Sequence, residues 1–124
     1  MKTILYIEDD PSLRQLVEFM LQKKNDVLFL QEETGAAGIR TARERRPDII
    51  LLDLSLPDIS GYEVLSRLKS DNGTGATPVI ALSGDSLPED IARGIEAGFD
   101  AYLTKPLGVS EFYSLIDGML DSGT

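Results

Sequence analysis

Four consecutive branched apolar residues between two carboxylates constrain the fold of this chain most strongly. Residues 49–52 read Ile-Ile-Leu-Leu, follow Pro47 and Asp48, and end at Asp53. An apolar run of this length is typical of a strand buried on both faces, as in a parallel sheet covered by helices. Ligands in such sheets bind just past the carboxyl ends of the strands. Asp53 is therefore expected at the active edge, although this stretch alone is equally compatible with a turn aspartate.

An alternation of strands and helices runs through the whole chain and extends this prediction. Four other short segments have the β-branched, aromatic and apolar character of buried strands: residues 2–7, 27–30, 78–82 and 101–103. Such alternation predicts a parallel sheet covered on both faces, and right-handed crossovers favour an open doubly wound topology. The predicted fold class is α/β, with five parallel strands and five helices.

Capping signals mark where the helices are expected to begin. Asp10 before Pro11 fits an N-cap followed by proline at the first helical position. Thr34 fits the N-cap of a second helix. The next two caps are serines followed three residues later by glutamate, the spacing of a capping box: Ser60 and Ser86. Apolar residues at helical spacing between positions 109 and 120 predict a last amphipathic helix.

Length and composition favour one domain and exclude several chemistries. The 124 residues fit a single domain, with residues 121–124 expected as a frayed tail or linker. Because the sequence contains neither cysteine nor histidine, disulfides, thiolate nucleophiles, Cys- or His-based zinc sites and Ser-His triads are excluded. No apolar run approaches the length of a membrane span and no signal peptide is visible, so we expect no membrane contact.

The net charge of −9 bears on the kind of partner that this chain can bind. Sequence-independent binding of nucleic acid depends on lysine and arginine side chains that neutralise phosphates. We therefore expect no direct nucleic-acid binding. An acidic domain is compatible with a protein partner that presents a basic or mixed surface.

Charged and polar residues follow the expected strands at their carboxyl ends. They are Glu8, Asp9, Asp10, Asp53, Ser83 and Lys105. Because the ends of parallel strands share one edge of the sheet, these side chains should converge. Clustered carboxylates favour a cation, and an oxygen-only set of ligands suits Mg²⁺ or Mn²⁺. A carboxylate can also attack a phosphoryl group, whose oxygens a lysine, a hydroxyl and a metal ion would stabilise.

Four stretches carry a family signature. They are Ile-Glu-Asp-Asp-Pro at 7–11, Asp-Leu-Ser-Leu-Pro-Asp-Ile-Ser-Gly at 53–61, Ala-Leu-Ser-Gly at 81–84 and Gly-Phe-Asp-Ala-Tyr-Leu-Thr-Lys-Pro-Leu at 98–107. In this order and spacing, the sequence resembles the receiver domain of two-component response regulators. The resemblance covers essentially the whole chain and implies a flavodoxin-like strand order of 2-1-3-4-5.

The resemblance also implies roles for the acids at the strand ends. Asp53 would be the phosphoacceptor. Asp9 and Asp53 would ligate Mg²⁺ directly, together with the backbone carbonyl of Ser55, and Glu8 would act through a water molecule. Asp10 is expected to serve mainly as the helix cap.

Further roles are implied for residues after the fourth and fifth strands. Lys105 would pair with a phosphoryl oxygen, and its bond to Pro106 would be cis. Ser83 would bind another phosphoryl oxygen, which would let Tyr102 turn inward and repack the face of the fourth helix, fifth strand and fifth helix. Tyr102 could equally be a half-buried core aromatic without a switching role. Asp85 would help to set the lifetime of the phosphoryl group.

The function implied by the resemblance is phosphorelay signalling in the cytoplasm. The domain would accept a phosphoryl group from a sensor histidine kinase or a histidine phosphotransfer protein and would then bind a downstream protein. It would catalyse only its own phosphorylation and dephosphorylation. A homodimer, the identity of the kinase and the question of a stand-alone or larger protein are left open by the sequence.

Three alternatives compete with this interpretation. A receiver-like docking module would use the same fold without ever carrying phosphate, although the complete set of acids, serine and lysine argues against it. A phosphatase resembling the haloacid dehalogenases would need a second aspartate two residues after Asp53, where this chain has Ser55. A nucleotide-binding sheet would need a G-x-G-x-x-G motif after the first strand, and the sequence lacks one.

Overall fold

The buried apolar run forms the centre of the sheet, as the sequence predicts. The computed structural model describes residues 1–24 and 26–122. Five parallel strands are hydrogen-bonded in the order β2-β1-β3-β4-β5, and β3 (Ile49–Asp53) is buried at every position. The other strands are β1 (Lys2–Ile7), β2 (Val27–Glu32), β4 (Val79–Ser83) and β5 (Ala101–Thr104). The expected doubly wound α/β fold and strand order are confirmed.

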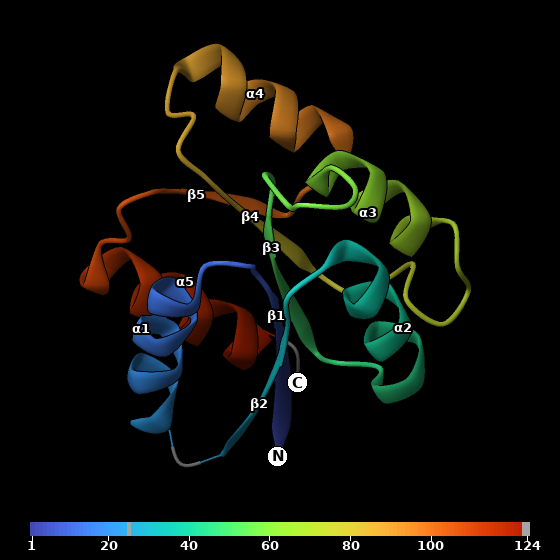
Figure 1. The fold of residues 1–124 in the computed structure, drawn as a ribbon. Coiled ribbons are helices and arrows are strands. Elements are labelled where there is room, and N and C mark those ends of the chain that lie inside the picture. Colours follow the sequence, from blue (N-terminus) through green and yellow to red (C-terminus); the bar gives the residue numbers. More distant parts are fainter. Residues whose placement is uncertain (25, 123–124) are drawn as a thin grey trace.

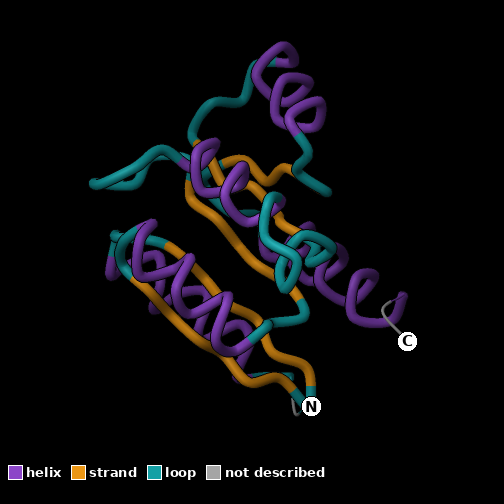
Figure 2. The backbone as a smooth tube through the Cα atoms, turned by 90° about the vertical axis from the view of Figure 1, so that its right-hand side faces the viewer, coloured by secondary structure: helices purple, strands orange, loops and turns teal. Residues whose placement is uncertain are grey.

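Helices cover both faces of this sheet (Figure 1). One side carries α1 (Pro11–Gln22) and α5 (Val109–Ser122), and the other carries α2 (Gly35–Arg45) and α3 (Gly61–Lys69). The remaining helix, α4 (Pro88–Ala97), follows β4 and contacts β5. Figure 2 faces the α2 side and shows the strands running alongside the helices. No helix in the described part of the chain has the length and apolar character of a membrane-spanning segment.

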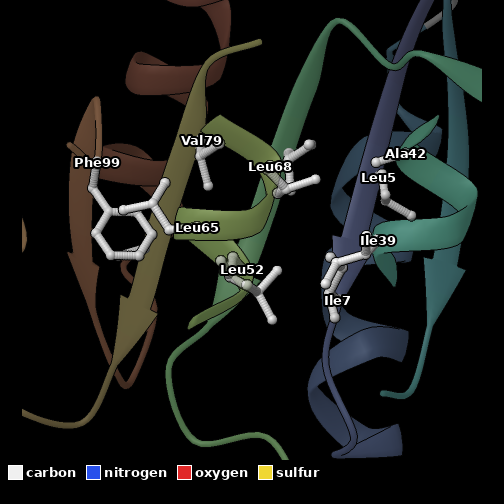
Figure 3. Close-up of a cluster of buried hydrophobic side chains, with 12 residues drawn as sticks. Leu5, Ile7, Ile39, Ala42, Leu52, Leu65, Leu68, Val79 and Phe99 are labelled. Carbon is white, nitrogen blue, oxygen red and sulfur yellow. The ribbon is translucent and has the colours of Figure 1, made fainter. Parts of the chain in front are cut away.

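Two apolar clusters fix the helices to the sheet. On the α2 and α3 face, strand residues pack against side chains of these two helices, and Figure 3 shows Leu5, Ile7, Leu52, Ile39, Ala42, Leu65 and Leu68 among them. On the opposite face, residues of β1, β3 and β4 pack against α1 and α5, with Val17, Met20, Leu21, Phe112 and Ile116 contributed by the helices. Burial of these side chains is the main stabilising contribution to the fold.

The strand register determines which residues meet at the carboxyl edge. Ile7, the last residue of β1, is paired with Leu52 of β3. Asp53 is paired with Leu82, the residue before Ser83. Ser83 is in turn paired with Thr104, directly before Lys105. The residues that follow these pairs therefore lie at one end of the sheet.

Three of the four predicted helix caps are confirmed by hydrogen bonds. Asp10 is the N-cap of α1 and accepts from the Ser12 N–H, with Pro11 at the first helical position. Thr34 caps α2, and Ser60 caps α3 by accepting from the N–H of the residue three positions later. These caps satisfy N–H groups that have no partner within their helices.

The fourth predicted cap, Ser86, is wrong. The N-cap of α4 is Leu87, which makes no side-chain capping bond, and Pro88 occupies the first helical position. Proline has a fixed φ that suits this position, and the N–H that it lacks would have had no partner within the helix. Pro88 therefore places the start of α4 one residue later than the capping box predicts.

The C-terminal helix is longer than expected. α5 extends to Ser122, so residues 121–122, which the sequence places in a tail or linker, are helical. Residues 123–124 lie outside the described part of the chain. The helix surface also differs from the expected pattern at Val109, which is 55% exposed, whereas Phe112 and Ile116 are fully buried.

Two helical glycines occupy opposite environments. A Cβ atom at Gly38 in α2 would lie 2.4 Å from Cδ1 and 2.6 Å from Cγ1 of Ile7, a fully buried residue of β1. A Cβ atom at Gly118 in α5 would meet no atom within 4 Å. The first glycine therefore permits close packing of α2 on β1, whereas the second has no packing role.

Alanine at these two positions should change stability in opposite directions. We expect Gly118→Ala to raise the free energy of unfolding by about 0.5–1 kcal/mol, since alanine is the better helix former. Gly38→Ala should lower it by about 1–3 kcal/mol, because the gain in helix propensity is outweighed by overpacking against Ile7. Urea denaturation of both variants measures the difference, and equal stabilisation of both would contradict the close packing described here.

Candidate functional site

The site is centred on a lysine shared by two buried carboxylates. The Nζ atom of Lys105, which follows β5, lies 3.1 Å from Oδ1 of Asp53 and 3.2 Å from Oε1 of Glu8. Glu8 and Asp53 are only 1% and 3% exposed. Such buried carboxylates need a partner of opposite charge, and the strand register brings that partner from β5.

The protonation of Glu8 is strongly affected by this environment. Burial is the largest cause that raises the pKa of Glu8 to about 7, and the hydrogen bond and negative charge of Asp53 add to it. Burial alone would lower the pKa of Lys105, but its hydrogen bond with Asp53 and the charges of Asp53 and Glu8 raise it overall. Lys105 therefore remains positively charged, whereas Glu8 can exchange a proton near neutral pH.

The acids also form a group that can hold a metal ion. Carboxylate oxygens of Glu8, Asp9 and Asp53 all lie within 4.8 Å of one another, and Asp9 is exposed to solvent. When all three carboxylates are ionised, the single ammonium leaves an excess of negative charge that a divalent cation would balance. An all-oxygen set with one accessible acid fits a hard cation that retains water ligands.

The loop after β3 is held in place by hydrogen bonds at both ends. The Ser55 N–H donates to Oδ1 of Asp53 over 3.2 Å. Further along the loop, the two carboxylate oxygens of Asp58 accept from the N–H groups of Gly35 and Ala36 over 2.8 and 2.9 Å. These N–H groups open α2, so Asp58 joins the loop of the candidate site to a second helix.

Ser83 and Tyr102 are connected through the loop after β4. The Ser83 hydroxyl, in a residue that is 3% exposed, accepts from the Asp85 N–H over 3.0 Å. The Tyr102 hydroxyl donates to the Asp85 carbonyl over 2.9 Å. A Cβ atom at Gly94 would lie 2.7 Å from the Tyr102 ring, so the absence of a side chain there lets α4 lie directly on this ring. Tyr102 is thus half-buried and contacts both the loop and α4.

The structure brings together most of the predicted site residues. Glu8, Asp9, Asp53 and Lys105 form one cluster. Ser83 lies at the adjacent end of β4, and the Lys105 N–H donates to its backbone carbonyl. Tyr102 makes its described polar contact with the loop after β4 and not with the cluster. The peptide bond between Lys105 and Pro106 is cis, as the resemblance implies.

Two residues with direct polar contacts to this region were not predicted. Tyr6 is fully buried, and its hydroxyl donates to Oε1 of Glu8 over 2.9 Å. The position of Tyr6 two residues before Glu8 could have indicated the contact, because alternate residues of a strand point to the same side. For Asp58 the sequence offers no comparable signal, since its partners are 22 and 23 residues away in the chain.

The fold and the acid cluster together define a doubly wound α/β domain whose acidic strand ends could hold a metal ion. The sequence pattern of the response regulator receiver domain matches residues 4–117. The chain therefore belongs to the response regulator receiver family.

Curated relatives of the chain support this assignment. The chain is 37% identical over 109 residues to the "Probable transcriptional regulatory protein TcrX" of Mycobacterium tuberculosis, a match over 88% of this chain and 45% of the relative. It is 39% identical over 117 residues to the "Cell cycle response regulator CtrA" of Brucella ovis, over 94% of this chain and 49% of the relative. The chain thus spans about half the length of these curated relatives.

A solved structure matches over nearly the full length. The receiver domain of the sensor histidine kinase PA1611 from Pseudomonas aeruginosa is 28% identical, with a TM-score of 0.87, and the match covers 97% of this chain and 98% of that domain. Its description states that a magnesium ion is coordinated in the active-site cleft. Receiver domains are signalling modules and not conventional enzymes.

The raised pKa of Glu8 predicts pH-dependent cation binding. A proton and a cation compete for the Glu8 carboxylate, so the affinity for Mg²⁺ should rise as the pH increases through about 7 and fall below it. Calorimetric titration with Mg²⁺ across this range measures the effect. In Glu8→Gln, which cannot ionise, this part of the pH dependence should be lost; an unchanged profile would contradict the role of Glu8.

Asp58 should contribute to stability as a charged group. Hydrogen bonds from Ala36 and Gly35 lower the pKa of Asp58 below its ordinary value. Its contribution should therefore be present above the ordinary pKa of aspartate and disappear as the pH falls through the lowered value. We expect Asp58→Ala to cost about 1 kcal/mol of unfolding free energy, as for other lost helix caps. Asp58→Asn, which keeps one acceptor oxygen, should cost less in urea denaturation at neutral pH.

Proposed function

We propose that this domain accepts a phosphoryl group on Asp53 in a Mg²⁺-dependent phosphorelay. The observation that carries the proposal is the half-buried ammonium of Lys105, 3.1 Å from Asp53, beside acids whose oxygens lie within 4.8 Å of one another. This arrangement combines a carboxylate nucleophile, a cation site and a fixed positive charge. It is the chemistry that transfer of a phosphoryl group to a carboxylate requires.

Each residue has a separate role in the proposed reaction. One oxygen of Asp53 forms a bond to phosphorus while the bond from phosphorus to a histidine nitrogen of the partner breaks. Lys105 binds a phosphoryl oxygen and offsets its charge. The metal site is formed by Asp9, Asp53 and the Ser55 carbonyl, with Glu8 acting through water. Mg²⁺ or Mn²⁺ in this site would neutralise charge that develops on the transferred group.

The proposed partners follow from this chemistry. Because the chain has no histidine, the phosphohistidine belongs to a sensor histidine kinase or a histidine phosphotransfer protein in the cytoplasm. The domain catalyses only its own phosphorylation and dephosphorylation. The net charge of −9 favours output through a protein partner over direct contact with nucleic acid.

The proposed output surface is the face formed by α4, β5 and α5. A phosphoryl oxygen that binds the Ser83 hydroxyl competes with the Asp85 N–H, which that hydroxyl now accepts over 3.0 Å. Movement of Asp85 would also affect the carbonyl that accepts from Tyr102. Because the Tyr102 ring lies against Gly94, the change would reach α4. This series of contacts supports a switching role for Tyr102.

Intact-mass spectrometry after incubation with acetyl phosphate tests the proposal. We expect one added phosphoryl group in the presence of Mg²⁺ and none in its absence. Asp53→Asn should abolish the adduct. Asp48→Asn, directly before the opposite end of β3, should retain it, because Asp48 accepts from the Thr3 N–H at the amino ends of the strands.

Two results would contradict the proposed function. An adduct that persists in Asp53→Asn would place the phosphoryl group elsewhere. A wild-type protein that gains no adduct and shows no Mg²⁺-dependent binding of beryllofluoride, a stable phosphoryl mimic, would favour a phosphate-independent docking module.

A further inference from the structure

Tyr6 places a hydroxyl group in the interior of the sheet. Its side chain is one of the largest fully buried side chains of the protein and lies in the apolar cluster beneath α1 and α5. Its ring lies 6.3 Å from that of Phe29 in β2, measured between centroids. A phenylalanine would fill nearly the same volume without a polar atom. A buried hydroxyl is costly unless it forms a hydrogen bond, so its partner matters.

That partner is a residue of the proposed cation site. The Tyr6 hydroxyl donates to Oε1 of Glu8 over 2.9 Å, and the ammonium of Lys105 lies 3.2 Å from the same oxygen. The other oxygen, Oε2, accepts a longer bond of 3.3 Å from the Asp10 N–H. Two donors thus hold Oε1 of Glu8, whereas the backbone hydrogen bond to Oε2 is longer.

We propose that Tyr6 is a positioning residue for the cation site, which it serves by holding Glu8 through Oε1 so that Oε2 remains available to the water shell of the cation. This inference rests on the proposed function, and it adds a residue that lies behind the acids and touches neither metal nor phosphoryl group.

The argument concerns the rotational freedom of a glutamate side chain. Glu8 has three side-chain torsions, and holding it in one arrangement costs conformational entropy each time a cation binds. A fixed donor in the sheet selects that arrangement before the cation arrives. Burial is the largest cause that raises the pKa of Tyr6 above its ordinary value, and the charge of Glu8 adds to it, so the hydroxyl remains a donor.

Tyr6 also affects how Lys105 is shared. Oε1 of Glu8 accepts from the Tyr6 hydroxyl and also lies next to the Lys105 ammonium. The same ammonium contacts both Glu8 and Asp53. Without the hydroxyl, Glu8 can turn to bind Lys105 more fully. Lys105 would then be drawn from Asp53, where the proposed reaction requires it.

The test is Mg²⁺ binding by Tyr6→Phe, measured by calorimetric titration in the absence of any phosphoryl donor. We expect the dissociation constant to rise roughly tenfold, the lower end of what loss of a supporting hydrogen bond behind a metal site typically costs. The matched control is Tyr113→Phe. This substitution also removes a tyrosine hydroxyl that donates a hydrogen bond, here to the Met20 carbonyl over 2.8 Å. This control should bind Mg²⁺ like the wild type.

A merely structural role for Tyr6 would lower the urea midpoint in Tyr6→Phe and leave the Mg²⁺ dissociation constant unchanged, which would overturn the inference.

A second measurement asks whether Tyr6 acts through Glu8. In a Glu8→Gln background, adding Tyr6→Phe should change Mg²⁺ affinity less than twofold, because the carboxylate that Tyr6 positions is gone. A full tenfold loss in both backgrounds would overturn the proposed route through Glu8.

The outcomes separate this inference from the proposed function. A wild-type protein that binds Mg²⁺ but gains no phosphoryl group, together with weaker binding in Tyr6→Phe, would leave the inference standing without the phosphorelay. Normal phosphorylation on Asp53 with equal Mg²⁺ affinity in both proteins would overturn the inference alone. A wild-type protein without measurable Mg²⁺ binding would overturn both.

Discussion

The ion pair of Lys105 with Glu8 and Asp53 is the interaction on which the rest of the site depends. Two carboxylates that are almost fully buried would repel each other and lose their hydration without a compensating charge. Lys105, which follows β5, supplies this charge, and β5 must therefore be in register with β4 and β3 for the three charged groups to meet. The sheet order is thus as much a requirement of the electrostatics as of the apolar core. The remaining negative charge and the oxygen-only set of side chains suit a small, hard cation.

The parts of this structure that the sequence predicts are those governed by local rules. The apolar run before Asp53, the caps at Asp10 and Ser60, and the convergence of strand ends each depend on few residues close in sequence. The sequence misplaces the start of α4 because two local signals compete there, and the helix follows the signal of Pro88 and not the capping box of Ser86. Asp58 could not be predicted, because its role requires knowing that a loop returns to a helix formed more than 20 residues earlier.

The first strand serves the core and the site at once. Ile7 packs beneath α2, where Gly38 allows the helix to approach, whereas Tyr6 lies on the opposite face and reaches Glu8. Alternation of side chains along a strand makes this division possible within two consecutive residues. A glance at the apolar pattern of residues 4–7 suggests only a buried strand. The hydroxyl of Tyr6 has a role only through its hydrogen bond to Glu8, two residues later.

The weak attachment of α4 has an energetic consequence. Within α4, all of whose ten residues are described, Gly94 is the only buried position, and Leu87 and Ile95 at and near its ends are 57% and 48% exposed. An element with so little buried surface can rearrange at a small cost in free energy. A coupling of about 1–3 kcal/mol between two sites changes the ratio of two conformations by roughly 5- to 150-fold. A contact as modest as one hydroxyl hydrogen bond would therefore be enough to shift α4 between two arrangements, and the proposed signal would be a change in their populations.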